Sequence, residues 1–210
     1  VLIDEEIEFL IGHPYPSDEF KSAGFDKTLN TEVFYRDRVY DKHLLATFPA
    51  VNGLSCVVMG TAENTERSST EWIITLIHEH FHQYQNSYPD YYESVNKLNL
   101  SKGDKTGMWM LNYDFAYDNK LINKQFKAYG SALYKVLTSL DSENFEHNLN
   151  RYLTERKKIK SILSASDYKY FSFQNWQEGI ARYTEYKFLD LMKDYTPAKA
   201  AECVYRYDVL

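Results

Sequence analysis

A pair of apolar runs joined by a tight-turn signal constrains this chain most, because it requires a sheet in the N-terminal part. The runs lie on either side of Asn52-Gly53, within residues 44–62. Both turn residues tolerate positive φ, so the pattern predicts a hairpin of two strands. Residues 31–40 are rich in Val and aromatic residues and predict a further β segment.

Helices are expected to follow this hairpin. Ser68, with Glu71 three residues on, forms a capping box that predicts a helix start, and Pro89 predicts an end near Asn86. Residues 87–118 show no clear period and predict a long loop or short elements. Further helices are expected over residues 120–140, 143–164 and 175–194, with an interruption at 164–173.

The composition limits the class of protein. The chain has 210 residues, of which 44% are hydrophobic and 26% charged, as in a soluble globular protein. Its length predicts one domain, or one domain with a small lobe. Its net charge of −6 argues against nucleic acid as the main partner. Arg156-Lys157-Lys158-Ile159-Lys160 is the densest basic run, and its acidic neighbours indicate a solvated helix face. No apolar run approaches 18 residues, so no membrane span is expected.

The first residue and the two cysteines leave alternatives open. The chain begins with Val1 rather than Met, so we expect that an N-terminal segment has been removed; a signal peptide would favour a secreted or periplasmic location. Cys56 and Cys203 could pair in a disulfide or remain buried free thiols.

The segment His78-Glu79-His80-Phe81-His82 contains the pattern H-E-x-x-H. On a helix, residues four apart lie on one face, so His78 and His82 can bind a single metal ion. Glu79 is turned about 100° around the axis, where it can reach a water molecule beside the metal and act as a general base. No ligand role is expected for His80, which falls on the opposite flank.

The apolar residues of this helix predict which face is buried. They form a stripe at helical spacing, made of Ile73, Ile74, Ile77, Phe81 and Tyr84. The stripe is expected to anchor the helix, with both imidazoles on its flank and Glu79 turned toward the polar side.

A catalytic zinc site needs a third protein ligand and an open position. Glu178 and Glu185 lie two turns apart at one edge of an apolar stripe on the last predicted helix. Glu178 is the preferred ligand, with Gly179 allowing close approach of a backbone or substrate, and Glu185 then supports the site from behind. The alternatives are Glu185 as the ligand, or a surface ion-pair ladder through Arg182.

His78-Glu79-x-x-His82 followed by Glu178-Gly179-Ile180-Ala181-Arg182-Tyr183-Thr184-Glu185 resembles the gluzincin branch of the zincin metallopeptidases. The resemblance implies a zincin-like α+β fold, with a small mixed sheet, then the H-E-x-x-H helix and a mainly helical C-terminal part. It also implies a catalytic domain over residues 1–210, divided into an α/β part of about 1–90 and a helical part of about 91–210.

The extended metzincin pattern is absent, and one departure from the thermolysin-like members limits how close the kinship is. Tyr88 stands where a metzincin has its third His. Arg182 stands where thermolysin-like members have an Asp that orients a zinc-binding His, so the sequence does not resemble thermolysin closely.

The implied function is that of a zinc hydrolase acting on a peptide or protein substrate. Zn²⁺ would be held by His78, His82 and Glu178, with Glu79 as base and Tyr183 or Tyr186 stabilising the oxyanion. Two other hypotheses stay open: a binding protein on a zincin scaffold that has lost catalysis, or a helical domain with a chance motif. The substrate and the oligomeric state are unknown from sequence.

Overall fold

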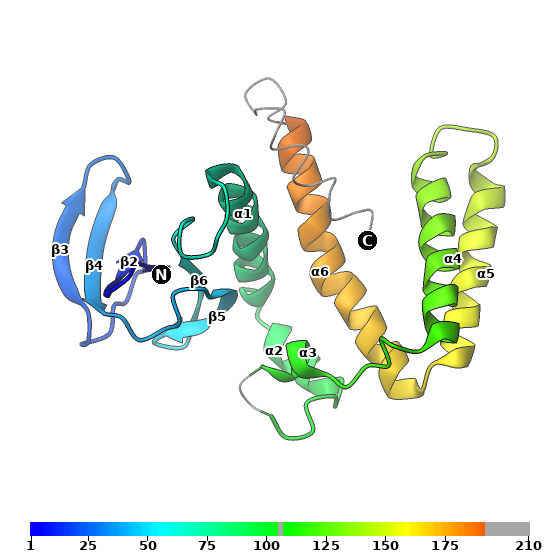
Figure 1. Ribbon diagram of the computed structural model, residues 1–210, viewed down its shortest axis with the longest axis horizontal. Coiled ribbons are helices and arrows are strands. Elements are labelled where there is room, and N and C mark those ends of the chain that lie inside the picture. The colour runs from blue at the N-terminus through cyan, green and yellow to red at the C-terminus, as the bar shows by residue number, and fades with distance from the viewer. Residues whose placement is uncertain (105–106, 192–210) are drawn as a thin grey trace. The chain divides into compact units, whose positions relative to one another are not determined.

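Six strands form one sheet in the computed structural model, which describes residues 1–104 and 107–191 (Figure 1). The order across the sheet is β3-β4-β2-β1-β6-β5. β1 and β6 run parallel, whereas every other neighbouring pair is antiparallel, so the sheet is mixed. The strands are β1 (Leu2–Ile3), β2 (Ile7–Ile11), β3 (Lys21–Asp26), β4 (Thr31–Asp37), β5 (Leu45–Val51) and β6 (Leu54–Gly60).

β5 and β6 are the two strands predicted around Asn52-Gly53. Asn52 has φ 47° and Gly53 has φ 74°, the positive values that a tight hairpin turn of this kind requires. β5 forms an edge of the sheet, and its pairing with β6 shifts register between Phe48 and Val51. Pro49 lies within this irregularity, at an edge where a missing N–H is tolerated. β4 confirms the β segment expected within residues 31–40.

A cluster of buried apolar side chains holds the sheet together. Ile3, Leu10 and Val58 are at most 1% exposed and lie at its centre. Cys56 belongs to the same cluster and is a buried free thiol. Its possible disulfide partner, Cys203, lies outside the described residues.

Helix α1 (Ser69–Asn86) follows β6 and begins with the predicted capping box. The Ser68 hydroxyl accepts from the Glu71 N–H at 3.2 Å, and the Glu71 carboxylate accepts from the Ser68 N–H at 2.9 Å. Side chains of α1 bond to the backbone of β6: Trp72 Nε1 donates to the Gly60 oxygen at 2.7 Å and Gln83 Nε2 to the Ser55 oxygen at 2.8 Å. Polar contacts therefore fix α1 against the hairpin.

The remaining elements are helices, which makes the fold α+β as predicted. Residues 87–118 contain short elements, whereas the predicted interruption at 164–173 is wrong. Ser164 caps a helix there, because its hydroxyl accepts from the Asp167 N–H at 3.0 Å, and Tyr170 and Phe173 are buried on that helix. Residues 192–194 of the predicted last helix lie outside the described residues. The helices are α2 (Tyr91–Lys97), α3 (Trp109–Asn112), α4 (Lys120–Leu137), α5 (Phe145–Ile162) and α6 (Ala165–Leu191).

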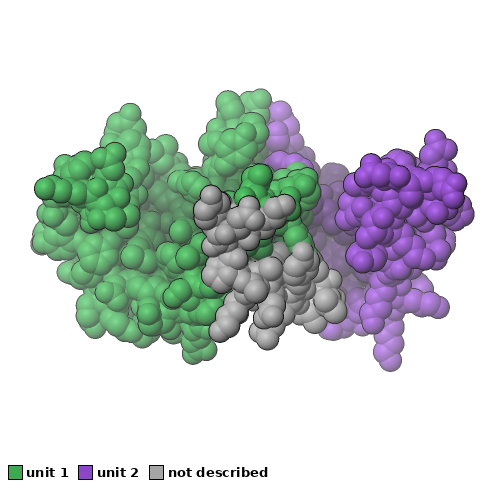
Figure 2. Space-filling model, turned by 90° about the horizontal axis from the view of Figure 1, so that it is seen from above, with its two compact units in different colours: residues 1–92, 177–210 green, residues 93–176 purple. Residues whose placement is uncertain are grey.

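The chain divides into two compact units, coloured separately in Figure 2. Unit 1 comprises residues 1–92 and 177–210, and unit 2 comprises residues 93–176. The boundary therefore falls within α6, and the helix from Gln177 on belongs with the sheet and α1. The single catalytic domain implied by the resemblance stays a prediction.

Unit 2 is built around the pair α4 and α5. Ile122 and Tyr129 of α4 pack with Ile159 of α5 in a cluster of buried side chains. Over residues 1–104 and 107–191, none of the helices combines the length and apolar composition that crossing a bilayer requires.

Candidate metal centre

His78 and His82 of α1 meet Glu178 of α6 within unit 1. The two Nε2 atoms lie 2.9 Å apart. Glu178 Oε2 lies 3.2 Å from His78 Nε2 and 3.4 Å from His82 Nε2. The structure thus brings together the three residues predicted as ligands, and their ligand atoms could hold one metal ion. We call them the His-His-Glu group.

Glu185 lies behind the first imidazole. His78 Nδ1 is 2.6 Å from Glu185 Oε1, and the Glu185 side chain is 1% exposed. Arg182 Nη1 donates to the same carboxylate at 2.8 Å, which partly neutralises it. Because Glu185 accepts from Nδ1, it orients the ring so that Nε2 faces Glu178 and His82. Glu185 therefore lies on the Nδ1 side of the ring and is not part of the His-His-Glu group.

Amide side chains take the equivalent place behind the second imidazole. His82 Nδ1 lies 2.8 Å from Gln85 Oε1 and 3.2 Å from Gln177 Nε2. Gln85 Nε2 donates to the Gln177 backbone oxygen at 3.2 Å, and the Tyr91 hydroxyl donates to Gln177 Oε1 at 3.1 Å. Burial raises the pKa of Tyr91 to about 12, so its hydroxyl keeps the proton that it donates. If His82 Nδ1 donates to Gln85 Oε1, it cannot also accept from Gln177 Nε2, and Nε2 of the ring is then an acceptor.

The His-His-Glu group consequently favours a positive charge between its two Nε2 atoms and its carboxylate oxygen. With both Nδ1 atoms donating, two Nε2 lone pairs and a carboxylate oxygen face one another, which is repulsive unless a cation lies between them. The same attraction favours the protonated imidazoles. Burial by itself lowers the pKa of His78, but Glu178 and Glu185 outweigh it and raise the pKa to about 9. Burial would raise the pKa of Glu178, yet hydrogen bonds from His78 and His82 lower it to about 2. This donor set fits a divalent metal ion.

Glu79 lies against the edge strand of the sheet. Its side chain is buried, and the Thr47 hydroxyl on β5 lies 2.8 Å from Glu79 Oε2 and 2.8 Å from the Glu79 backbone oxygen. The expectation that Glu79 turns toward the polar side of the helix is therefore wrong. The strand supplies a hydroxyl that satisfies the buried carboxylate.

The predicted apolar stripe of α1 is wrong in part. Ile73 is 51% exposed and Tyr84 is 56% exposed, whereas Ile74, His82 and Gln85 are buried. The buried face carries the site residues because hydrogen bonds with α6 and β5 satisfy them.

A pocket of about 360 Å³ opens beside this centre. Both His78 and Glu79 line it, so a bound molecule would contact the predicted base and one predicted ligand. The full lining is Leu45, Arg67, Glu71, Ile74, Thr75, His78, Glu79, Arg182 and Glu185.

The predicted tyrosines lie elsewhere on α6. Tyr183 is 58% exposed, with Lys187 Nζ 5.6 Å from its ring centroid, and it is outside the residues that line the pocket. Tyr186 packs against Ile74 with Leu189. A role of either hydroxyl toward an oxyanion stays a prediction.

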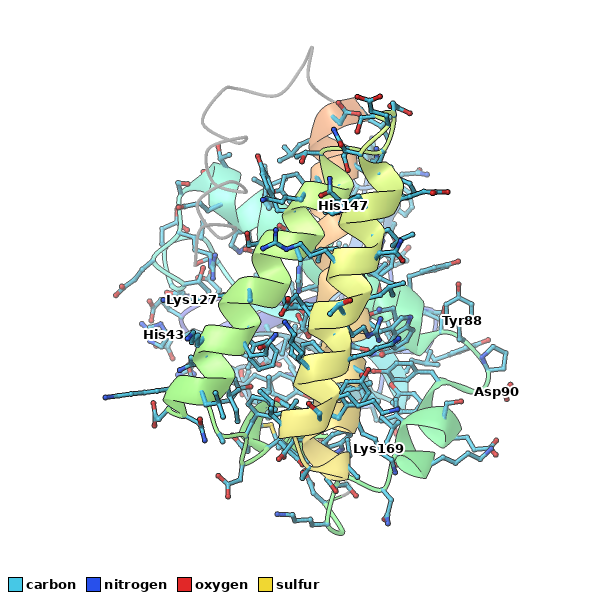
Figure 3. All side chains as sticks on the ribbon, turned by 90° about the vertical axis from the view of Figure 1, so that its right-hand side faces the viewer. His43, Tyr88, Asp90, Lys127, His147 and Lys169 are labelled. Atoms are coloured by element: carbon cyan, nitrogen blue, oxygen red, sulfur yellow. The ribbon has the colours of Figure 1, made fainter. Side chains whose placement is uncertain are left out.

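Other residues singled out in the sequence take no part in the described geometry. His80 is exposed. Nothing lies within 4 Å of a Cβ placed at Gly179, so no backbone of the described chain approaches it. Tyr88 is 51% exposed and projects from the turn after α1 (Figure 3).

Sequence reasoning missed the supporting residues Thr47, Gln85 and Gln177. Gln85 is three residues after His82 and so shares its helix face, which is a usable signal. Thr47 gives no such signal, because only the folded sheet brings it to α1. No protein family, no curated protein and no solved structure matches this chain, so the candidate centre is supported by its own geometry alone.

Proposed function

We propose that this protein is a zinc-dependent metallopeptidase of the gluzincin type with a zincin-like fold. The spacing of the three ligand atoms carries the proposal. With bonds of about 2.0–2.1 Å to zinc, tetrahedral ligand atoms lie about 3.3 Å apart. The separations in the His-His-Glu group are 2.9, 3.2 and 3.4 Å.

The choice of zinc and of hydrolysis is supported by the donor set. Two imidazoles and one carboxylate are a ligand set of catalytic zinc sites, in which a fourth position stays open. A carboxylate behind a ligating His, as Glu185 is behind His78, fixes the ring and increases its basicity. The edge strand β5 beside α1 is consistent with a zincin-like arrangement.

The residues of the chain have distinct tasks in this mechanism. Bound zinc would supply a Lewis acid that polarises the scissile carbonyl and activates a water molecule. Glu79 takes the proton from the attacking water and delivers it to the leaving amine. Its Oε2 accepts from Thr47, which leaves Oε1 to carry the proton. Glu185 keeps the His78 ring oriented throughout.

Metal analysis of the purified protein, together with a peptide-library cleavage assay, tests this function. Glu79→Gln is expected to retain zinc and to lose hydrolysis, because the amide cannot accept the proton. Hydrolysis retained by that variant would refute the assignment of the base. Bound zinc without any cleavage would instead support the non-catalytic binding protein, and failure to take up zinc would support a chance motif.

A further inference from the structure

The pocket beside the candidate centre extends along α1 from Glu79 toward the start of the helix. Its far end is formed by Arg67, just before the helix, and by Glu71 in the first turn. Ile74 and Leu45 give it apolar walls. The pocket therefore offers space next to the predicted base for one substrate side chain or chain end.

The carboxylates that line this pocket already have partners. Glu71 accepts from the Ser68 N–H and hydroxyl at 2.9 and 2.8 Å. Glu79 is hydrogen-bonded by Thr47. Glu185 lies between His78 and Arg182. Each of these three carboxylates therefore already accepts at least one hydrogen bond from the protein.

Arg67, unlike these carboxylates, has a buried polar atom without a hydrogen-bond partner. Its side chain is half-buried, and its Nε is buried without a hydrogen-bond partner. No ion pair of Arg67 occurs within residues 1–104 and 107–191. A buried donor that has lost its water without gaining a partner is costly. The Arg67 side chain also lines the pocket, so a turn of its guanidinium toward an acceptor bound there would remove that cost.

We propose that this pocket binds a carboxylate of the peptide substrate, with Arg67 as its main partner. A guanidinium matches a carboxylate with paired hydrogen bonds, and Arg182, the other guanidinium of the lining, already bonds to Glu185. The apolar walls suit the methylene groups that carry an acidic side chain. The inference rests on the proposed function and names its substrate class: peptides with a carboxylate next to the scissile bond.

Paired peptides distinguish the two sources of such a carboxylate. One pair differs by Glu against Gln next to the scissile bond, with amidated C-termini. The other pair is neutral in its side chains and differs by a free against an amidated C-terminus. We expect kcat/KM to be about 10- to 100-fold higher for the charged member of one pair. Equal rates within both pairs would overturn the carboxylate proposal while leaving the peptidase proposal intact.

Variants at Arg67 test whether this residue causes the preference for the charged peptide. In Arg67→Gln, the ratio of kcat/KM for the charged peptide to kcat/KM for the neutral peptide of the preferred pair is expected to fall toward one. In Arg67→Glu, the neutral peptide is expected to become the better substrate. Arg151→Gln on α5 removes the same charge outside the pocket and should keep the wild-type ratio. A wild-type ratio retained by folded, zinc-loaded Arg67→Gln would overturn the assignment. If Arg67→Gln fails to fold, Arg67→Lys serves instead, and a ratio unchanged from wild type in it would contradict paired bonding by the guanidinium.

Calorimetry separates failure of this inference from failure of the proposed function. If zinc-loaded wild-type protein cleaves no peptide, the peptidase proposal fails, and binding of the same peptide pairs is measured directly. Tighter binding of the charged peptide that is lost in Arg67→Gln would support the carboxylate site. Equal binding of charged and neutral peptides would overturn it.

Discussion

Glu178 and Glu185 are chemically identical carboxylates, yet they lie in different surroundings, and we propose different tasks for them. Glu178 is 52% exposed and faces both Nε2 atoms, whereas Glu185 is 1% exposed and faces His78 Nδ1. A metal ligand must reach the open side of the site, and a supporting carboxylate must lie behind the ring. The position of each Glu along α6, rather than its residue type, decides which side of the His78 ring its carboxylate faces.

This difference predicts unequal losses of zinc affinity. Glu185→Ala should weaken zinc binding about 10- to 100-fold, the usual effect of losing a residue that orients a ligand. Glu178→Ala should weaken it more, because a direct bond is lost. Competition with a chromogenic chelator measures both constants. The reverse order would show that Glu185 is the ligand.

Thr47 predicts an effect on rate without an effect on metal content. Thr47→Val removes the hydroxyl that holds Glu79, and kcat should fall about 10- to 100-fold, as for loss of a hydrogen bond to a charged group. Thr47→Ser keeps the hydroxyl and is the matched control. Zinc content should stay at the wild-type level in both. Equal kcat for the Val and Ser variants would contradict the positioning role.

At the scale of elements, Gly60 at the end of β6 lies too close to neighbouring backbone to carry a side chain. A Cβ at Gly60 would lie 1.9 Å from the Lys42 backbone oxygen. Gly60→Ala should therefore lower the free energy of unfolding by about 1–3 kcal/mol or more. Gly130→Ala in α4 is the control, since its Cβ meets nothing within 4 Å and Ala favours a helix by about 1 kcal/mol. Chemical denaturation measures both, and a Gly60→Ala variant as stable as wild type would refute the close contact.

The sequence predicts the elements with local signals and fails where tertiary partners decide. The capping box at Ser68 and the turn at Asn52-Gly53 are local, and both are found where expected. β1 was not predicted because it has two residues, Leu2–Ile3, and depends on β2 and β6 for its pairing.

Helix faces show the same limit. Periodicity places the apolar residues inside, but on α1 the buried face contains Glu79, His82 and Gln85. On α6 it contains Gln177 and Glu185 beside Ala181. Each polar residue is buried because a residue distant in sequence satisfies it, which a single sequence does not reveal. The His pair and Glu178 could be proposed because their spacing and type are informative, whereas Thr47 and Arg67 could not.

At the scale of the whole molecule, the candidate centre belongs to one unit. His78, His82 and Glu178 all lie in unit 1, and none of the group comes from residues 93–176. The metal should therefore stabilise unit 1 selectively.

Removal of zinc tests this selectivity. We expect dialysis against a chelator to lower Tm, because zinc at about 1,000 times its Kd contributes about 4 kcal/mol. Hydrogen exchange should rise in α1 and in residues 177–191 but not in α4 and α5. His82→Ala, which lacks a ligand, should show no response to zinc. A uniform rise in exchange over the whole chain would contradict a centre confined to unit 1.

The division of unit 1 into two segments has a consequence for biosynthesis. A ribosome makes His78 and His82 first, then all of residues 93–176, and only afterwards adds Glu178. Because units fold as they emerge, the sheet and α1 can form while the third ligand is still missing. For a peptidase this order is protective: a nascent or prematurely terminated chain carries two histidines but no complete centre with which to cut its neighbours.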